Sequence, residues 1–462
     1  MANESIFLII NLISLCATHF FCLPLRQSTI ELILFMSTLT LAIIVVFVLG
    51  YALIAMESLT KINKAAVALL MFVFCWVLYM VDPSPFVQLM HPEFKGIGDQ
   101  LVTFANKLIT EHLGDTATTL FFLMGAMTIV EIVDQNGGFN WVKDVMRSKS
   151  KRSLLWKIAF MTFFLSAILD NLTTSIVMIM ILRKLVQDHK DRMIYASLVI
   201  IAANSGGAFS PIGDVTTIML WNAGMITAGG VISEIFIPSL ISMIIPAFVL
   251  QFLLKGKLGG DMLETDHSGD TELLEFNGSQ RKIIFAIGVG GLCFVPVFHY
   301  FTDLPPFVGI LLVLGILWTI TEIFYRSLHR SKGDSEDFSK RVSNLLSRID
   351  MSTILFFLGI LMAVACLEEV GVLHELGGGL NSFFQGNHYV VTGIIGVLSS
   401  IVDNVPLVAG SMGMYPVQAT GDMAVDGIFW QLLAYCAGVG GSILIIGSAA
   451  GVVVMGLERI TF

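Results

Sequence analysis

Ten long runs of apolar residues constrain this chain more than any other feature of its sequence. Most of them approach or exceed the roughly 20 residues that an α-helix needs to cross a bilayer. The runs cover Ser5–Leu23, Leu32–Met56, Ala65–Val81, Ala117–Asp134, Ile194–Ala228, Val231–Leu254, Lys282–Tyr300, Pro306–Arg326, Met351–Leu367 and Ile428–Glu458. None alternates apolar and polar residues along short segments, as the strands of a membrane β-barrel do. The sequence therefore predicts an all-α polytopic membrane protein in the lipid bilayer, with residues 1–462 forming a single membrane domain.

The composition agrees with this prediction and excludes several other classes of protein. Apolar types make up 55% of the residues and charged types 13%, whereas an average soluble domain has about 25% charged residues. The formal charge is −9 and no basic tract occurs, which excludes a nucleic-acid partner. The six cysteines lie in apolar runs without a Cys-x-x-Cys pair, so we expect small core residues rather than disulfides or metal ligands. No His-Glu-x-x-His or Gly-x-Ser-x-Gly motif is present, so we expect neither an enzyme nor a bound cofactor.

Two further apolar segments, Ser153–Val186 and His388–Ala409, are each interrupted by a polar pair. Cytoplasmic loops of membrane proteins carry an excess of Lys and Arg. With the N-terminus in the cytoplasm and both segments turning back, only three basic residues fall outside, namely Arg26, Lys95 and Lys107. A straight crossing of the first segment would place the Arg183–Arg192 cluster outside, against that rule. We therefore expect re-entrant helical hairpins at residues 153–187 and 388–410.

Two other segments carry specific expectations. The first run, Ser5–Leu23, is preceded by Glu4 and by no basic residue, whereas a signal peptide begins with a positive segment. A retained helix is therefore favoured over a cleaved signal for residues 1–24. Farther along, we expect a short helix at Gln100–Leu113, separate from the span that begins at Ala117.

Three short segments recur in order at an offset of 233 to 235 residues. The matching pairs are Leu120–Leu123 with Leu355–Leu358, Asp170-Asn171 with Asp403-Asn404, and Gly206-Gly207 with Gly440-Gly441. Agreement of three offsets indicates an internal duplication. Five crossings separate the copies in the scheme above, and an odd number turns the second copy over. Inverted repeats of this kind are typical of secondary transporters, whose ion sites lie where the repeats meet.

The run Ile194–Ala228 is too long for one straight span. Its 35 residues would extend about 50 Å as a helix, at ~1.5 Å per residue. Pro211 lacks a backbone donor and the neighbouring glycines tolerate non-helical dihedral angles. We therefore expect a broken helix over residues 194–226, with a second one over residues 428–458.

Polar residues are expected to gather at these hairpin tips and helix breaks. The candidates are Asp170, Asn171, Thr173, Thr174, Asn204, Ser205, Asp214, Thr216, Thr217, Ser399, Asp403, Asn404, Ser442 and Ser448. A hard monovalent cation prefers several oxygen ligands and one negative charge. A carboxylate at membrane depth costs about 2.5–3.5 kcal/mol, so a proton or a metal ion should neutralise it. A group that accepts either ion, but not both, is the chemical basis of proton–cation exchange.

Simpler interpretations of the same residues stay open. Asp170, Asp403 and Asp214 can act as N-caps of the helices that follow them. Asn204 and Ser205 can merely satisfy the helix break, and Ser442 and Ser448 can be small packing residues. Glu131 and Asp134 are expected at a solvated helix end. None of the nine histidines shows a carboxylate–hydroxyl partner pattern, so a histidine pH sensor is not favoured.

Four segments together resemble the NhaD-type sodium/proton antiporters. They are Phe121–Asp134, Leu169–Thr174, Asn204–Thr217 and Val402–Pro406. These antiporters belong to the ion transporter superfamily, with the arsenite permeases and the divalent-anion/sodium symporters. The resemblance runs from about Val46 to the C-terminus, whereas the first thirty residues match no motif of the family.

The resemblance implies an activity and an assembly. The activity would be secondary active exchange of Na⁺, and often of Li⁺, for H⁺ by alternating access, with a role in pH homeostasis. The protein would be a homodimer in the plasma (inner) membrane of a prokaryote, with a cytoplasmic N-terminus. A transport domain, residues 115–226 and 350–458, would move in an elevator-type motion against a scaffold, residues 24–114 and 231–349. The Na⁺ ligands would be Asp170, Asn171, Asn204, Asp214 and Asn404.

A sodium-coupled dicarboxylate or oxyanion carrier of the same superfamily is the alternative function. Such carriers resemble this chain but place Ser-Asn-Thr at both hairpin tips, whereas the tips here carry Asp170 and Asp403. We also expect no Lys or Arg beside the substrate at the membrane midplane. An anion would therefore find little positive charge at this site.

Overall fold

The computed structural model describes residues 38–458, apart from residues 147, 149, 255, 257–275, 333–348, 401–402 and 445–446. The described residues form nineteen helices. The longer ones are α3 (Thr38–Ala55), α5 (Lys64–Val81), α7 (Asp99–Gln135), α9 (Lys151–Leu169), α10 (Asn171–Leu185), α11 (His189–Ala208), α13 (Ala228–Leu250), α14 (Gly278–Thr302), α15 (Pro306–Lys332) and α17 (Met351–Glu369). The shorter ones are α4 (Glu57–Thr60), α6 (Ser84–Met90), α8 (Asn140–Met146), α12 (Val215–Asn222), α18 (Val372–Phe383), α19 (His388–Leu398), α20 (Asn404–Met414), α21 (Ile428–Gly440) and α22 (Ala449–Glu458).

Eight of the described helices are long and apolar enough to cross a membrane. They are α3, α5, α7, α9, α13, α14, α15 and α17. Their outward faces carry large apolar side chains, such as Leu49 of α3 and Ile316 of α15. This confirms the prediction of an all-α polytopic membrane protein. The first predicted span, Ser5–Leu23, lies outside the described residues.

Helix α7 corrects one expectation from the sequence. The short helix predicted at Gln100–Leu113 and the span predicted from Ala117 are one continuous helix of 37 residues. Gly114 stands at the expected boundary, but a single glycine costs a helix only about 1 kcal/mol relative to alanine. No proline accompanies it in this segment, so the helix continues through the glycine.

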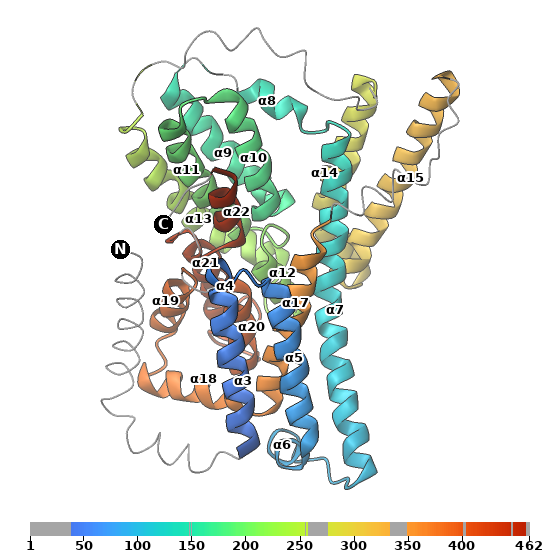
Figure 1. Ribbon diagram of the computed structural model, residues 1–462, viewed down its shortest axis with the longest axis vertical. Helices are drawn as coiled ribbons and strands as arrows, with labels where there is room; N and C mark the ends of the chain where they lie inside the picture. The colour runs from blue at the N-terminus through green and yellow to red at the C-terminus, as the bar shows by residue number, and fades with distance from the viewer. Residues whose placement is uncertain are drawn as a thin grey trace.

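The long helices flank the molecule at two different heights. Figure 1 shows α3 and α5 beside the lower half, α14 and α15 beside the upper half, and α7 running along almost the whole length. Helix α5 packs along α17, and α15 packs along α7. Each pair has a glycine in its interface. Gly359 of α17 lies against the backbone of Ala68, and Gly125 of α7 lies against the side chain of Ile310.

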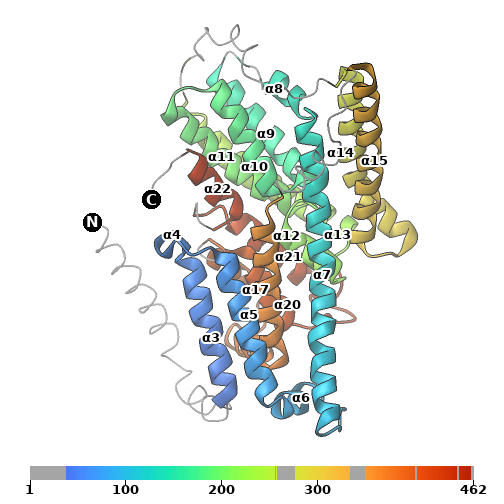
Figure 2. The same ribbon diagram turned by 45° about the vertical axis from the view of Figure 1, so that its right-hand side comes forward.

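Two helical hairpins approach the centre of the molecule from opposite ends. Helices α9 and α10 form the first and meet at Asp170, whose φ of 94° breaks the helical path. Helices α19 and α20 form the second, with residues 399–403 between them. Figure 1 shows α9 and α10 in the upper half and α19 and α20 in the lower half, and Figure 2 shows the same separation for α9, α10 and α20. The first predicted hairpin is therefore present as a packed helix pair, and the second as two successive helices. Their re-entry into the membrane stays a prediction.

Both predicted breaks in the long apolar helices are confirmed. Residues 209–214 separate α11 from α12, and residues 441–448 separate α21 from α22. The helix that follows each break packs against the hairpin of the other half of the chain. Helix α12 packs against α20, and α22 packs against α10. The two halves are thereby interlocked around the breaks.

Equivalent contacts tie each broken helix to its own hairpin. The Ser166 hydroxyl donates a hydrogen bond to the carbonyl of Ala203 at 2.6 Å, and the Ser399 hydroxyl donates one to the carbonyl of Ala437 at 2.7 Å. Gly206 also approaches the Phe163 carbonyl so closely that an added Cβ would lie 2.1 Å from its oxygen. Gly440 repeats this approach, with a Cβ 2.2 Å from the Gly396 carbonyl oxygen. Each pair of contacts is related by the offset of 233 or 234 residues seen in the sequence.

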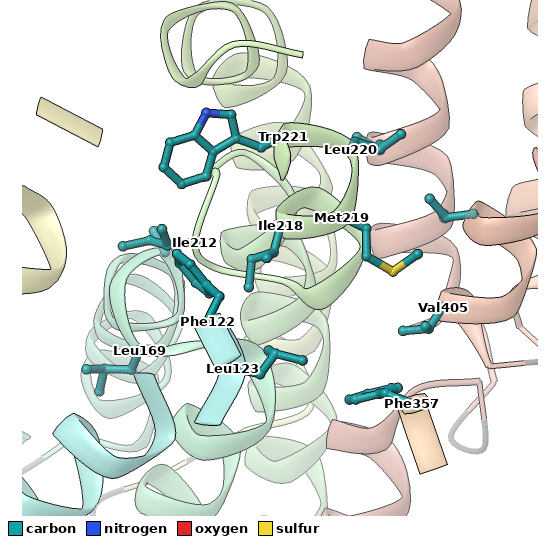
Figure 3. Packing of buried hydrophobic residues seen from close by; sticks show 14 of the residues in the cluster. Phe122, Leu123, Leu169, Ile212, Ile218, Met219, Leu220, Trp221, Phe357 and Val405 are labelled. Carbon is teal, nitrogen blue, oxygen red and sulfur yellow. The ribbon is translucent and has the colours of Figure 1, made fainter. Parts of the chain in front are cut away.

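The apolar core fixes α12 at the centre of the molecule. Figure 3 shows Ile218, Met219 and Trp221 of α12 lying between α7 and the segments that carry Phe357 and Val405. The rings of Trp221 and Phe122 pack edge to face with centroids 6.3 Å apart. Because side chains from both halves of the chain surround α12, the residue that begins this helix is held rigidly with respect to both.

Candidate functional site

Asp214 lies at the centre of the polar residues predicted from the sequence. It is the N-cap of α12 and accepts a hydrogen bond from the backbone N–H of Thr216 at 3.1 Å. Only 1% of its surface is exposed. The side-chain amides of Asn171 and Asn404 donate to its Oδ2 at 3.2 and 3.3 Å. The Asp-Asn pairs of both hairpin tips therefore direct their asparagines at one carboxylate.

Asn204 extends this network across the second helix break. Its Oδ1 accepts a hydrogen bond from the Asn171 amide at 3.1 Å, and its own amide donates to Ser442 at 3.0 Å and to Ser448 at 2.9 Å. The expectation that Ser442 and Ser448 only pack is therefore too simple, since both hydroxyls accept from Asn204. We use the name central network for Asn171, Asn204, Asp214, Asn404, Ser442 and Ser448.

Several buried hydroxyl groups beside the central network have no hydrogen-bond partner in the described part of the chain. They belong to Thr174 of α10, Ser205 of α11 and Thr217 of α12, and none of the three residues is exposed. Leaving a buried polar group unpaired costs about 1–3 kcal/mol. A carboxylate, amide oxygens and hydroxyls are together the ligand set that a hard cation prefers. The chemistry of these side chains thus fits a small cation, although the individual ligands stay a prediction.

Three helix N-termini surround Asp214. Asp214 precedes α12, while Asn171 and Asn404 are the first residues of α10 and α20. Helix N-termini carry partial positive charge from their unpaired N–H groups. Three such ends meet around a carboxylate that forms no ion pair among the described residues.

Asp170 and Asp403 are N-caps, as the simpler interpretation allowed. Asp170 accepts from the backbone N–H of Thr173 at 2.7 Å and from its hydroxyl at 2.8 Å. Asp403 accepts from the backbone N–H of Val405 at 3.3 Å. Within the described residues neither carboxylate forms a hydrogen bond with the central network. Whether either also binds the ion stays a prediction.

The other predicted residues form hydrogen bonds around the central network or outside it. Thr216 is buried and contributes its backbone N–H to Asp214, and Thr173 directs its hydroxyl to Asp170. Ser399 directs its hydroxyl to the Ala437 carbonyl, so it positions the second hairpin against α21. Glu131 lies in the last turn but one of α7 and accepts from Gln135 at 3.0 Å, outside the central network.

The structure reveals two charged contacts that the sequence analysis missed. The Lys64 ammonium lies 3.4 Å from Asp403, a predicted site residue. Whether a Lys or Arg lies beside the substrate at the membrane midplane stays a prediction. His91 and His112 both bond to Glu369, at 2.9 and 2.8 Å, so these histidines do have a carboxylate partner. Lys64 directly follows Asn63, an N-cap that accepts from Ala65 at 2.8 Å. That cap was a sequence signal for the start of α5, but nothing in the sequence shows what lies beside it.

These observations define the class of the protein. A buried oxygen-rich site at the meeting point of two broken helices and two hairpins, within a polytopic helical fold, defines a secondary ion transporter. A sequence model of the citrate transporter family matches residues 51–440.

Similar proteins narrow this class further. The chain is 42% identical to sodium/proton antiporter 1 of Arabidopsis thaliana over 421 residues, which are 91% of this chain and 68% of that protein. It is 30% identical to the Na⁺/H⁺ antiporter NhaD of Alkalimonas amylolytica over 441 residues, 90% of this chain and 84% of that protein. NhaD of Vibrio parahaemolyticus is 32% identical over 375 residues, 77% of this chain and 86% of that protein. The chain belongs to the citrate transporter family and, within it, to the NhaD-type sodium/proton antiporters. It is a membrane transporter and not an enzyme, as predicted.

Proposed function

We propose that the chain exchanges Na⁺ for H⁺ across its membrane, and that Asp214 binds the two ions alternately. The observation that carries this proposal is the position of Asp214, which is buried and receives amide donors from both hairpins. No described cation neutralises this carboxylate, so its charge has to be balanced by a proton or by a metal ion. One carboxylate cannot hold both at once, and binding of either ion therefore requires release of the other.

Li⁺ is proposed as a second transported cation. It is a smaller monovalent cation with the same preference for oxygen ligands as Na⁺. The donors around Asp214 are carboxylate, amide and hydroxyl oxygens, and none of them is a sulfur or imidazole ligand. The chemistry of these ligands therefore suits both ions.

The two halves of the chain are proposed to be inverted repeats. Support comes from the recurring contacts Ser166–Ala203 and Ser399–Ala437 and from the exchange of partners by α12 and α22. In this proposal residues 115–226 and 350–458 form the transport domain and residues 24–114 and 231–349 the scaffold. Helix α7 crosses the boundary between the two domains, because it is continuous from Asp99 to Gln135. The surfaces between transport domain and scaffold then include α5 against α17, α15 against α7, and α13 against α11 and α21.

The surroundings of the protein are also part of the proposal. A homodimer with a cytoplasmic N-terminus is proposed from the resemblance and from the distribution of Lys and Arg. The bacterial relatives support the inner membrane of a prokaryote, and the more similar plant relatives support a membrane of a plant cell equally well.

A sodium-coupled carboxylate carrier is the second candidate. The description of the matching family as citrate transporters and the presence of Lys64 beside the site favour it. Asp403 already neutralises Lys64, however, and Asp170 and Asp214 add negative charge without a described counterion. The charge around the site therefore favours a cation over an anion.

The test compares wild-type protein with Asp214→Asn in everted vesicles that have an acidic interior and contain a pH-sensitive dye. Addition of Na⁺ should release protons from wild-type vesicles and not from Asp214→Asn vesicles, because an amide cannot exchange a proton for Na⁺. Asp303→Asn is the matched control, since Asp303 is exposed at the end of α14 in a left-handed conformation that Asn tolerates. Exchange by a correctly inserted Asp214→Asn protein would refute the proposal. Sodium-stimulated uptake of a dicarboxylate, without a response to Na⁺ alone, would establish the second candidate instead.

A further inference from the structure

Lys64 places a positive charge beside the second hairpin. It is the first residue of α5, and its Nζ lies 3.4 Å from Oδ2 of Asp403, the N-cap of α20. The same Nζ lies 4.2 Å from the ring centroid of Phe356, at the distance of a cation–π contact. The side chains of Lys64 and Asp403 are 27% and 19% exposed. The ammonium is thus held by a carboxylate and an aromatic ring, and neither side chain of the ion pair is fully buried.

The pair is directly connected to the central network. Asp403 is followed by Asn404, whose amide donates to Asp214. A charge on Asp403 therefore acts on Asp214 through the first turn of α20. Neutralising Asp403 with Lys64 lowers the negative potential that a cation meets as it approaches Asp214.

The first hairpin lacks an equivalent pair among the described residues. Asp170 bonds only to the residues of its own helix turn. The contact of Gly359 with Ala68 of α5 corresponds to the contact of Gly125 with Ile310 of α15. Residues of α5 and α15 can be matched on this basis. Pro306 stands at the start of α15 where Lys64 stands at the start of α5. The positive charge therefore acts on one hairpin only.

Other polar groups around Lys64 do not replace Asp403 as its partner. The Glu57 carboxylate accepts from the backbone N–H of Lys64 at 3.2 Å, not from its ammonium. Asn63 exchanges hydrogen bonds with Ser352 of α17. These contacts fix the backbone of Lys64, so that the ammonium is directed at Asp403 and Phe356.

We propose that the tethered ammonium of Lys64 competes with the transported cation at the Asp403–Asp214 end of the site. Lys64 would thereby set the apparent affinity for Na⁺. This inference rests on the proposed Na⁺/H⁺ exchange. When no cation is bound, the ammonium balances Asp403. When Na⁺ arrives, it has to overcome this positive charge, so Lys64 raises the Na⁺ concentration that is needed for half-maximal exchange.

The test measures the apparent KM for Na⁺ of Lys64→Gln in proteoliposomes. We expect the KM to fall by up to about fivefold, the range that loss of one partly exposed charge contact allows, while exchange persists. Lys61→Gln is the matched control, because it removes the same charge three residues earlier, at an exposed residue that precedes α5. Lys64→Arg keeps the charge and should keep the wild-type KM. A merely structural contact would not lower the KM when it is removed.

The outcomes separate this inference from the proposed function. A wild-type protein that fails to exchange Na⁺ for H⁺ refutes the proposed function, whatever Lys64 does. A wild-type protein that exchanges, with an unchanged or raised KM in Lys64→Gln, refutes the role of Lys64 alone, as does a folded Lys64→Gln protein without exchange. If Lys64→Gln does not reach the membrane, Lys64→Met takes its place, since its stem keeps the contact with Phe356.

Discussion

Replacing Gly206 with alanine tests whether the close contact between α9 and α11 positions the central network. An added Cβ would lie 2.1 Å from the carbonyl oxygen of Phe163, whereas ordinary contacts begin near 3.4 Å, so the two helices would have to separate by about 1.3 Å. The obstacle is backbone, which cannot turn away as a flexible side chain can. Overpacking of this kind costs about 1–3 kcal/mol.

The helix propensity of alanine offsets part of this cost. Alanine is favoured over glycine inside a helix by about 1 kcal/mol, so the net loss of stability in Gly206→Ala should be up to about 2 kcal/mol. Gly290 of α14 is the matched control, because nothing lies within 4 Å of a Cβ added there. Gly290→Ala should be neutral or stabilising, and the two substitutions should therefore have opposite effects on stability.

Function should respond as well, because Asn204 lies only two residues before Gly206. A displacement of about 1 Å at a reacting centre can reduce a rate by about 100-fold. The assays are thermal unfolding of the purified protein in detergent and Na⁺-driven proton release from vesicles. Gly440→Ala should repeat both effects, since its Cβ would lie 2.2 Å from the Gly396 carbonyl oxygen. A Gly206→Ala protein that unfolds at or above the wild-type temperature, with full exchange, would refute this reasoning.

Two further predictions follow from the contacts around the site. Asn171→Ala and Asn404→Ala should each raise the KM for Na⁺ by about 10- to 100-fold, because each removes a hydrogen bond to a charged group worth about 1.5–3 kcal/mol. Asn106→Ala on the surface of α7 is the control, and an unchanged KM in either site variant would contradict the prediction. Glu458→Gln should lower the unfolding temperature clearly, because the buried Glu458 carboxylate pairs with Arg183 at 3.0 Å and Arg192 at 2.6 Å and thereby fastens α22 to α10 and α11. Glu111→Gln removes only an exposed pair with Lys107 and should leave the unfolding temperature unchanged.

The secondary structure was largely predictable because its signals are local. The apolar runs gave the spans, and Pro211 with its neighbouring glycines gave the break between α11 and α12. The asparagines at positions 171 and 404 were predicted through a repeated Asp-Asn pair, which the structure brings to one carboxylate. The continuity of α7 through Gly114 was not predictable, since one glycine is compatible with either a break or a helix.

The missed contacts have a different physical origin. Lys64 and Asp403 are 339 residues apart along the chain, and Glu369 meets His91 and His112 from similarly distant segments. Such pairs depend on how helices pack, which apolar periodicity alone does not specify. In a membrane helix the lipid-facing and the packed residues are equally apolar. The charged contacts between helices are therefore invisible in the pattern that predicts the helices themselves.

Asp170 and Asp403 at the hairpin tips differ from Asp214 at the helix break in their hydrogen-bond partners, and this difference bears on the mechanism. Asp170 bonds within its own turn, and Asp403 is balanced by Lys64. Asp214 alone receives side-chain donors from both hairpins, so a change in its charge alters hydrogen bonds in both halves of the chain at once. Alternating access requires that both halves respond to whether the site is occupied, since a ligand shifts a conformational equilibrium only through contacts that differ between the states. In the proposed mechanism, Asp214 is therefore the carboxylate at which we expect the binding of Na⁺ or H⁺ to be coupled to movement of the hairpins.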